Sequence, residues 1–172
     1  MEFASYLWWD FFIRWCHIIC GIMWIGHLWY FNFTQTPTMP KIPAELRPGV
    51  AKFILPEALF WFRWGAMGTI FFGLILAWMN GYLGSAIKIG IGDHSALDTD
   101  IGIGMWLGTI MWFNVWFIIW PNQKKNIGIT PATPDEIKVA ARTAGLASRV
   151  NTMLSIPMLY CMAGVHFYGI GM

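Results

Sequence analysis

The stretch Ile101-Gly-Ile-Gly-Met-Trp-Leu-Gly-Thr-Ile-Met-Trp-Phe-Asn-Val-Trp-Phe-Ile-Ile-Trp120 contains no charged side chain. About 20 apolar residues are what an α-helix needs to cross the hydrocarbon core of a bilayer. Pro121 follows directly, and proline cannot continue the hydrogen bonds of a helix interior. The stretch therefore predicts a membrane-spanning helix that Pro121 ends.

Three more apolar stretches are long enough to cross a bilayer, at residues 6–33, 58–83 and 150–170. The 172 residues are 57% hydrophobic and only 12% charged, about half the usual charge content. We expect one domain over residues 1–172, an all-α integral membrane protein built as an up-and-down four-helix transmembrane bundle. A separate short amphipathic helix is predicted from Thr133 to Ala147, between the third and fourth spans. The net charge of +2 is too small to indicate a nucleic-acid partner.

Lys and Arg gather in the two loops expected on one side of the membrane. Eight of the eleven basic residues lie there: Lys41, Arg47, Lys52, Lys124, Lys125, Lys138, Arg142 and Arg149. Basic loops stay on the cytoplasmic side. We therefore expect a multi-pass protein of the bacterial inner membrane with both termini in the periplasm.

Small residues recur at every fourth position of the second span, at Gly65, Thr69, Gly73, Ala77 and Gly81. Such a stripe lets a neighbouring helix backbone approach closely in a membrane. The stripe predicts close helix packing and no chemistry.

Two intramembrane histidines, His17 and His166, are expected at similar depth near the outer face. Gly21 lies one turn from His17 and leaves room for a flat ring, and Trp24 shares the same helix face. Two facing imidazoles suit axial ligation of a b-type haem iron. The alternative is that each histidine hydrogen-bonds a backbone carbonyl or a polar neighbour.

Arg14 lies one turn outward from His17 and four residues after Asp10, a spacing that allows an ion pair. Arg14 is therefore a candidate contact for a haem propionate. His27 lies about 15 Å from His17 along the helix and cannot share that metal.

A second group of polar side chains is expected in the inward half of the membrane: His27, Arg63, Asn114 and Asn151, with Arg149 at the end of the fourth span. Together they predict a pocket for a quinone, a quinol headgroup or a small planar anion. The alternative is structural, with Arg63 reaching the cytoplasmic interface and Asn114 making one interhelical hydrogen bond.

The outer loop holds Asp93, His94, Asp98 and Asp100 within eight residues. This cluster is compatible with a divalent cation or a basic partner. The alternative is a solvated loop in which Asp98 or Asp100 caps the third span.

Four segments, one in each span, together resemble the amino-terminal membrane domain of the membrane-bound urate hydroxylase (PuuD) family. They are Arg14-Trp-Cys-His-Ile-Ile-Cys-Gly-Ile-Met-Trp-Ile-Gly26 with Trp29-Tyr-Phe-Asn-Phe33, Ala58-Leu-Phe-Trp-Phe-Arg-Trp-Gly-Ala66, Asn114-Val-Trp-Phe-Ile-Ile-Trp-Pro-Asn-Gln-Lys124, and Ala144-Gly-Leu-Ala-Ser-Arg-Val-Asn-Thr-Met-Leu-Ser-Ile-Pro-Met158 followed by His166.

The resemblance implies an integral membrane oxidoreductase that hydroxylates urate and is linked to cytochrome c. Longer members of the family carry a cytochrome c domain, and because this chain has no CxxCH motif we expect a separate cytochrome c. The positions carried over as candidates are Arg14, His17, Arg63, Asn114, Arg149, Asn151 and His166.

The leading hypothesis is a haem b protein that passes electrons to a periplasmic cytochrome c, with His17 and His166 as axial ligands. If the protein is catalytic, Arg63 or Arg149 meets a negative charge on the substrate, with Asn151 beside them in the pocket. His27 then accepts a proton. The second hypothesis is an accessory subunit of a larger respiratory or photosynthetic membrane complex.

Overall fold

The computed structural model describes residues 5–91 and 96–168, and describes the backbone alone at 96–97 and 165–168. The described chain is 87% helical and contains no strand. The predicted all-α fold class is therefore confirmed for this part of the chain.

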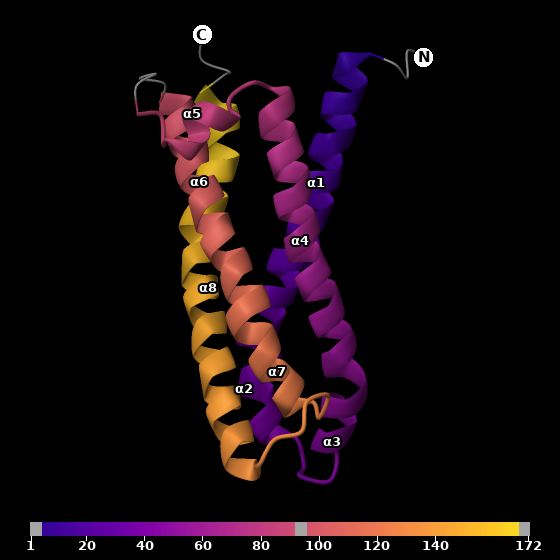
Figure 1. Ribbon diagram of the computed structural model, residues 1–172. Coiled ribbons are helices and arrows are strands. Elements are labelled where there is room, and N and C mark those ends of the chain that lie inside the picture. Colours follow the sequence, from indigo (N-terminus) through magenta and orange to yellow (C-terminus); the bar gives the residue numbers. More distant parts are fainter. Residues whose placement is uncertain (1–4, 92–95, 169–172) are drawn as a thin grey trace.

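The helices follow one another as long segments joined by short turns (Figure 1). α1 (Tyr6–Trp29) continues through the π-helix η1 (Tyr30–Gln35), α2 (Thr36–Thr38) and the 3-10 helix η2 (Met39–Lys41). α3 (Arg47–Gly49) and the π-helix η3 (Val50–Ile54) lead into α4 (Leu55–Met79), and the short α5 (Leu83–Ile87) follows. α6 (Ala96–Phe113), the π-helix η4 (Asn114–Ile119) and α7 (Trp120–Asn126) form the next segment, and α8 (Pro134–Tyr168) is the last.

Three helical segments are long and apolar enough to cross a membrane: Tyr6–Lys41, Arg47–Met79 and Asp98–Asn126. They contain the first three predicted spans. Among the described residues, α8 is not one of these three segments, and its first turn carries Asp135 and Glu136. The length and composition of these helices indicate a membrane protein.

Two predicted helix ends are wrong. The third span does not stop at Pro121, which is instead the second residue of α7, and the first continues helically past Pro37. In both places a π-helix precedes the proline, so a new α-helical stretch begins there. A proline in a first helical turn costs little because its missing N–H has no intrahelical partner there.

The prediction of a separate amphipathic helix is also wrong, because α8 runs without interruption from Pro134 to Tyr168. Ser148 and Arg149, which join the two predicted helices, include neither the proline nor the glycine that would end one. The amphipathic stretch is therefore the first half of one long helix.

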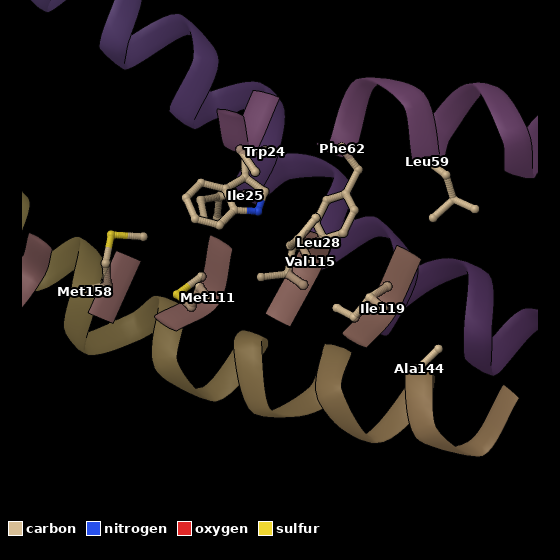
Figure 2. Packing of buried hydrophobic residues seen from close by; sticks show 11 residues of the cluster. Trp24, Ile25, Leu28, Leu59, Phe62, Met111, Val115, Ile119, Ala144 and Met158 are labelled. Carbon is tan, nitrogen blue, oxygen red and sulfur yellow. The ribbon is translucent and has the colours of Figure 1, made fainter. Parts of the chain in front are cut away.

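α1 packs mainly on α4, and α6 packs mainly on α8. The two pairs meet in a core at the half of the molecule that holds α2, α3 and α7 (Figures 1 and 2). The core contains Trp24, Ile25, Leu28, Leu59, Phe62, Ala66, Met111, Val115, Ile119, Ala144 and Met158.

Large apolar side chains also cover the outside of the helices. Leu7, Trp78 and Met153 are each more than 70% exposed. Apolar exposure on this scale is abnormal for a protein surrounded by water, whereas lipid tails accommodate it without cost. The exposed surface thus agrees with the three candidate spans.

Candidate functional site

The small-residue stripe of α4 faces α1. A Cβ atom added at Gly65 would lie 3.0 Å from the backbone nitrogen of Trp24 and 3.2 Å from the carbonyl oxygen of Cys20. Backbone atoms cannot rotate away, so only glycine permits this approach of the two helices. The predicted packing role of the stripe is confirmed at this position.

His17 lies half-buried against the same stripe. Its Nδ1 is 2.9 Å from the carbonyl oxygen of Thr69. Because a carbonyl only accepts hydrogen bonds, Nδ1 carries the proton and Nε2 keeps its lone pair. A Cβ atom at Gly73 would come within 2.9 Å of the His17 Cε1 atom, so the imidazole occupies the space that this glycine leaves.

Arg14 and Asp10 form the predicted ion pair, with 3.2 Å between the Arg14 Nη2 and the Asp10 Oδ2 atoms. Asn80, just after α4, donates a 2.6 Å hydrogen bond from Nδ2 to the other Asp10 oxygen. The Tyr6 hydroxyl donates to the carbonyl of Met79 at 2.9 Å. A polar network therefore ties the start of α1 to the end of α4.

Tyr82 lies beyond the end of α4, near this network. Burial raises the pKa of its phenol, Arg14 acts in the opposite direction, and the charges of Asp10 and Asp98 add to the rise. The polar end of the α1–α4 pair therefore faces the first turn of α6, which contains Asp98.

Among the described residues, His17 has the hydrogen bond expected of one axial haem ligand. A ligating histidine commonly donates its other ring N–H to a backbone carbonyl, which fixes the tautomer and the ring orientation, and His17 does this through Thr69. His166 belongs to the last turns of α8, and its side chain lies outside the described residues. Trp24 is fully buried in the core, where its indole Nε1 has no hydrogen-bond partner in the described part of the chain.

Asn114 and Asn151 join the α6–α7 segment to α8. Asn114 donates from Nδ2 to the Oδ1 of Asn151 at 2.8 Å, and Asn151 donates from Nδ2 to the carbonyl of Met111 at 2.9 Å. Asn151 is fully buried. The pair matches the structural alternative given for Asn114, one interhelical hydrogen bond.

Arg63 stacks on aromatic rings of the neighbouring segment. Its guanidinium carbon lies 3.3 Å from the ring centroid of Trp120 and 5.7 Å from that of Trp116. Its Nε donates to the carbonyl of Leu59 at 3.1 Å. These contacts hold the cation between α4 and α7.

His27 lines a groove of about 690 Å³ between α1 and the start of α4. Its Nδ1 lies 2.7 Å from the carbonyl of Met23 in its own helix. Glu57 lines the same groove, together with apolar and aromatic residues that include Ile22 and Trp61. This groove is called the His27 groove below.

Arg149 lines a second, smaller groove of about 440 Å³, between η1–α2 and α8. Asn32 and Thr152 also line it, and Asn32 donates a 2.8 Å hydrogen bond to the Ser148 hydroxyl. Of the polar residues expected in one inward pocket, the structure thus brings Asn114 and Asn151 together, whereas His27, Arg63 and Arg149 have separate surroundings.

Sequence reasoning missed two groups that the geometry brings to the candidate sites, the Thr69 carbonyl and the Glu57 carboxylate. Thr69 was visible as a member of the small-residue stripe, but no sequence signal shows which carbonyl a neighbouring side chain will reach. Glu57 follows Pro56 at the start of α4, where an acidic residue also stabilises the helix dipole.

The acidic outer loop is only partly described, because Asp93 and His94 lie outside the described residues. Asp98 lies in the first turn of α6, and Asp100 follows in the same helix. Among the described residues no group of three or more His, Cys, Asp or Glu side chains is arranged to hold a metal ion.

Comparison with known proteins gives one match. The family model described as "Urate oxidase N-terminal" matches residues 93–170, a range that contains α6, η4, α7 and α8. The searches of curated proteins and of solved structures returned no match. The match includes Asn114, Arg149 and Asn151, whereas Arg14 and His17 lie before it. Over residues 93–170 the chain is thus similar to the family described as "Urate oxidase N-terminal", consistent with the resemblance that its sequence motifs indicate.

Proposed function

We propose that the chain is a membrane-embedded b-type haem protein that passes electrons outward to a separate cytochrome c and is related in chemistry to urate hydroxylase. In this proposal α8 is a fourth span beside the three candidate spans, and the four cross the bacterial inner membrane as a bundle. The basic residues of the loops support an orientation with both termini in the periplasm. The family match over residues 93–170 supports the link to urate.

The state of His17 is the observation that carries the proposal. The Thr69 carbonyl holds the proton on Nδ1, so the Nε2 lone pair is free to bind iron. Gly73 leaves the space that the ring occupies, which keeps the imidazole in one position between α1 and α4. His166 is the proposed second ligand. Haem, when bound, supplies reversible one-electron exchange.

Arg14 is the proposed partner of a haem propionate. It lies one turn outward from His17, and its side chain is 34% exposed although it is paired with Asp10. A guanidinium offers five donors, so contact with Asp10 leaves N–H groups for a second carboxylate. Asn80 holds Asp10 in place and thereby fixes the direction of Arg14. Trp24, deeper on α1, is fully buried in the core and is therefore left out of the proposed haem contacts.

Urate, the substrate implied by the family, is planar and anionic, and Arg149 is the proposed contact for its charge. Arg149 lines its groove together with Thr152, and no hydrogen bond to the Arg149 side chain occurs among the described residues. His27 lines a separate groove, so it would accept a proton only from a ligand bound in that groove. The contacts of Arg63 and Asn151 favour positioning roles, since both side chains bind neighbouring helices.

An accessory subunit of a larger respiratory or photosynthetic complex is the second candidate. The outward aromatic residues favour it, because Trp9, Trp78 and Trp106 are between 46% and 72% exposed. Tryptophan is enriched where one protein contacts another. Chains that co-purify with the protein in mild detergent would support this candidate.

The visible spectrum of the purified chain tests the haem proposal. We expect Soret and α bands of reduced b-type haem, lost in His17→Ala and in His166→Ala and kept in the matched variant His27→Ala. Helical content from far-UV circular dichroism shows that each variant is folded. A folded wild-type chain that takes up no haem on reconstitution would overturn the proposal. Urate-dependent reduction of added cytochrome c then distinguishes an enzyme from an electron carrier.

A further inference from the structure

The His27 groove holds an imidazole and a carboxylate within mainly apolar walls. His27 and Glu57 line it from α1 and α4, and Ile22, Phe53 and Trp61 are among the apolar side chains around them. Its volume of about 690 Å³ falls within the range of about 300–1,000 Å³ that is common for small-molecule sites. The groove is therefore large enough for an aromatic headgroup with the beginning of an apolar tail.

The imidazole and the carboxylate are both acceptors of hydrogen bonds. Because the His27 Nδ1 donates to the Met23 carbonyl, the Nε2 atom offers a lone pair. The Glu57 carboxylate, when ionised, only accepts. A ligand that matches this pair presents two hydroxyl donors.

The charge of the groove disfavours an anion. Glu57 lies in the lining, and no Lys or Arg is among the described residues that line the groove. Urate would therefore meet a carboxylate without a compensating cation. A neutral ligand avoids this repulsion.

The polar pair lies at one edge of the expected hydrocarbon layer. His27 is about 31 Å along the helix axis from Tyr6, at 1.5 Å per residue, and Glu57 is about 33 Å from Met79. Both distances are close to the thickness of the hydrocarbon core, about 30 Å. Tyr30 and Trp61 also line the groove, and such residues favour the membrane interface. An amphiphile would lie here with its ring at the interface and its tail between the lipids.

We propose that the His27 groove binds a quinol, the reduced form of a membrane quinone. One hydroxyl donates to the Nε2 of His27, the other donates to Glu57, and the tail lies along Ile22 and its apolar neighbours. The oxidised quinone presents carbonyl acceptors instead and loses both hydrogen bonds. The groove is selective for the reduced form for this reason. The proposal stands without the haem, because it needs only α1, η3 and α4.

Competition for a photoreactive label tests the proposal. The full chain in lipid nanodiscs is labelled with an azido-ubiquinol, kept reduced under argon, and mapped by peptide mass spectrometry. We expect label within residues 22–30 and 53–61. Decylubiquinol should displace it at a concentration about 30-fold lower than decylubiquinone, the ratio expected for two hydrogen bonds of about 1 kcal/mol each. Decanol, which has the tail without the ring, should not displace it.

Two matched pairs of variants locate the site. Gly26 lines the groove and has open space where a side chain would project, as does Gly145 in α8. Gly26→Leu should abolish labelling, and Gly145→Leu should retain it. Glu57→Gln should lower the preference for quinol to about fivefold, the ratio for the one remaining hydrogen bond to His27, because an amide also donates. Glu45→Gln in the exposed loop should keep the full preference.

Label at other segments, displacement by decanol as effective as by decylubiquinol, or equal displacement by quinol and quinone would overturn the assignment. His17→Ala separates this result from the haem proposal. We expect the variant to lose haem and retain labelling, so either proposal can fail without the other.

Discussion

Gly65→Ala should weaken the packing of α1 on α4. The new methyl group would lie 3.0 Å from the Trp24 backbone nitrogen, 3.2 Å from the Cys20 carbonyl oxygen and 3.3 Å from the Trp24 Cα. All three are backbone atoms, so relief requires one helix to move relative to the other by a few tenths of an ångström. The parts of α1 and α4 on either side of Gly65 then lose contact as well.

The size of the effect follows from two opposing terms. Alanine in place of glycine within a helix gains about 1 kcal/mol. An added methyl group in a closely packed interface costs about 1–3 kcal/mol. Gly145 supplies the matched control, because a Cβ atom there meets nothing within 4 Å. Gly145→Ala should therefore gain the helix propensity of alanine without a packing cost. Gly65→Ala should therefore be less stable than Gly145→Ala by about 1–3 kcal/mol.

Reversible unfolding in mixed micelles, with dodecyl sulfate as the denaturant and far-UV circular dichroism as the signal, measures this difference. Gly68→Ala adds a graded comparison, since its methyl group would meet the Cys20 side chain, which can rotate, and its loss of stability should be smaller. If Gly65→Ala is as stable as Gly145→Ala, the α1–α4 approach does not depend on glycine and the reasoning fails.

Asn151→Leu should lower the free energy of unfolding by about 1–3 kcal/mol in the same assay, because it leaves the Asn114 amide without its acceptor. Arg63→Lys should lower the free energy of unfolding by about 0.5–2 kcal/mol, since an ammonium cannot stack flat on the Trp120 indole as the guanidinium does. Glu136 accepts hydrogen bonds from the backbone N–H and the hydroxyl of Thr133, which hold the pKa of its carboxyl below the usual range. Its contribution to helix stability is present above the unfolded pKa and lost as pH falls through the lower folded pKa. Hydrogen exchange at the start of α8 should accelerate over that interval, and Glu136→Gln should remove the effect.

The periodicity of small residues was enough to predict which face of α4 packs on another helix. Spacing also predicted the Arg14–Asp10 ion pair, because residues four apart meet on a helix surface whatever the tertiary fold. Both predictions depend on local geometry alone. They succeed for that reason.

Predictions that depend on how two helices are rotated relative to each other were less successful. Depth alone grouped His27, Arg63 and Asn151, but rotation about each helix axis directs them to different neighbours. The predicted helix ends before Pro37 and at Pro121 are wrong for another reason. A π-helix precedes each proline and changes which backbone N–H groups need a partner. No sequence pattern used above predicts a π-helix. Single-sequence rules for proline assume a regular α-helix.

The two histidines of α1 show why the neighbouring helix matters for function. Each donates its Nδ1 hydrogen to a backbone carbonyl, but His17 uses Thr69 of α4 and His27 uses Met23 of its own helix. The state of His27 is therefore set within α1, whereas that of His17 depends on how closely α4 approaches. A small separation of the two helices would lengthen the His17–Thr69 contact and leave the His27 hydrogen bond intact. The glycine stripe, which has no chemistry of its own, thus sets the His17–Thr69 distance, on which the proposed binding of haem iron by the His17 Nε2 depends.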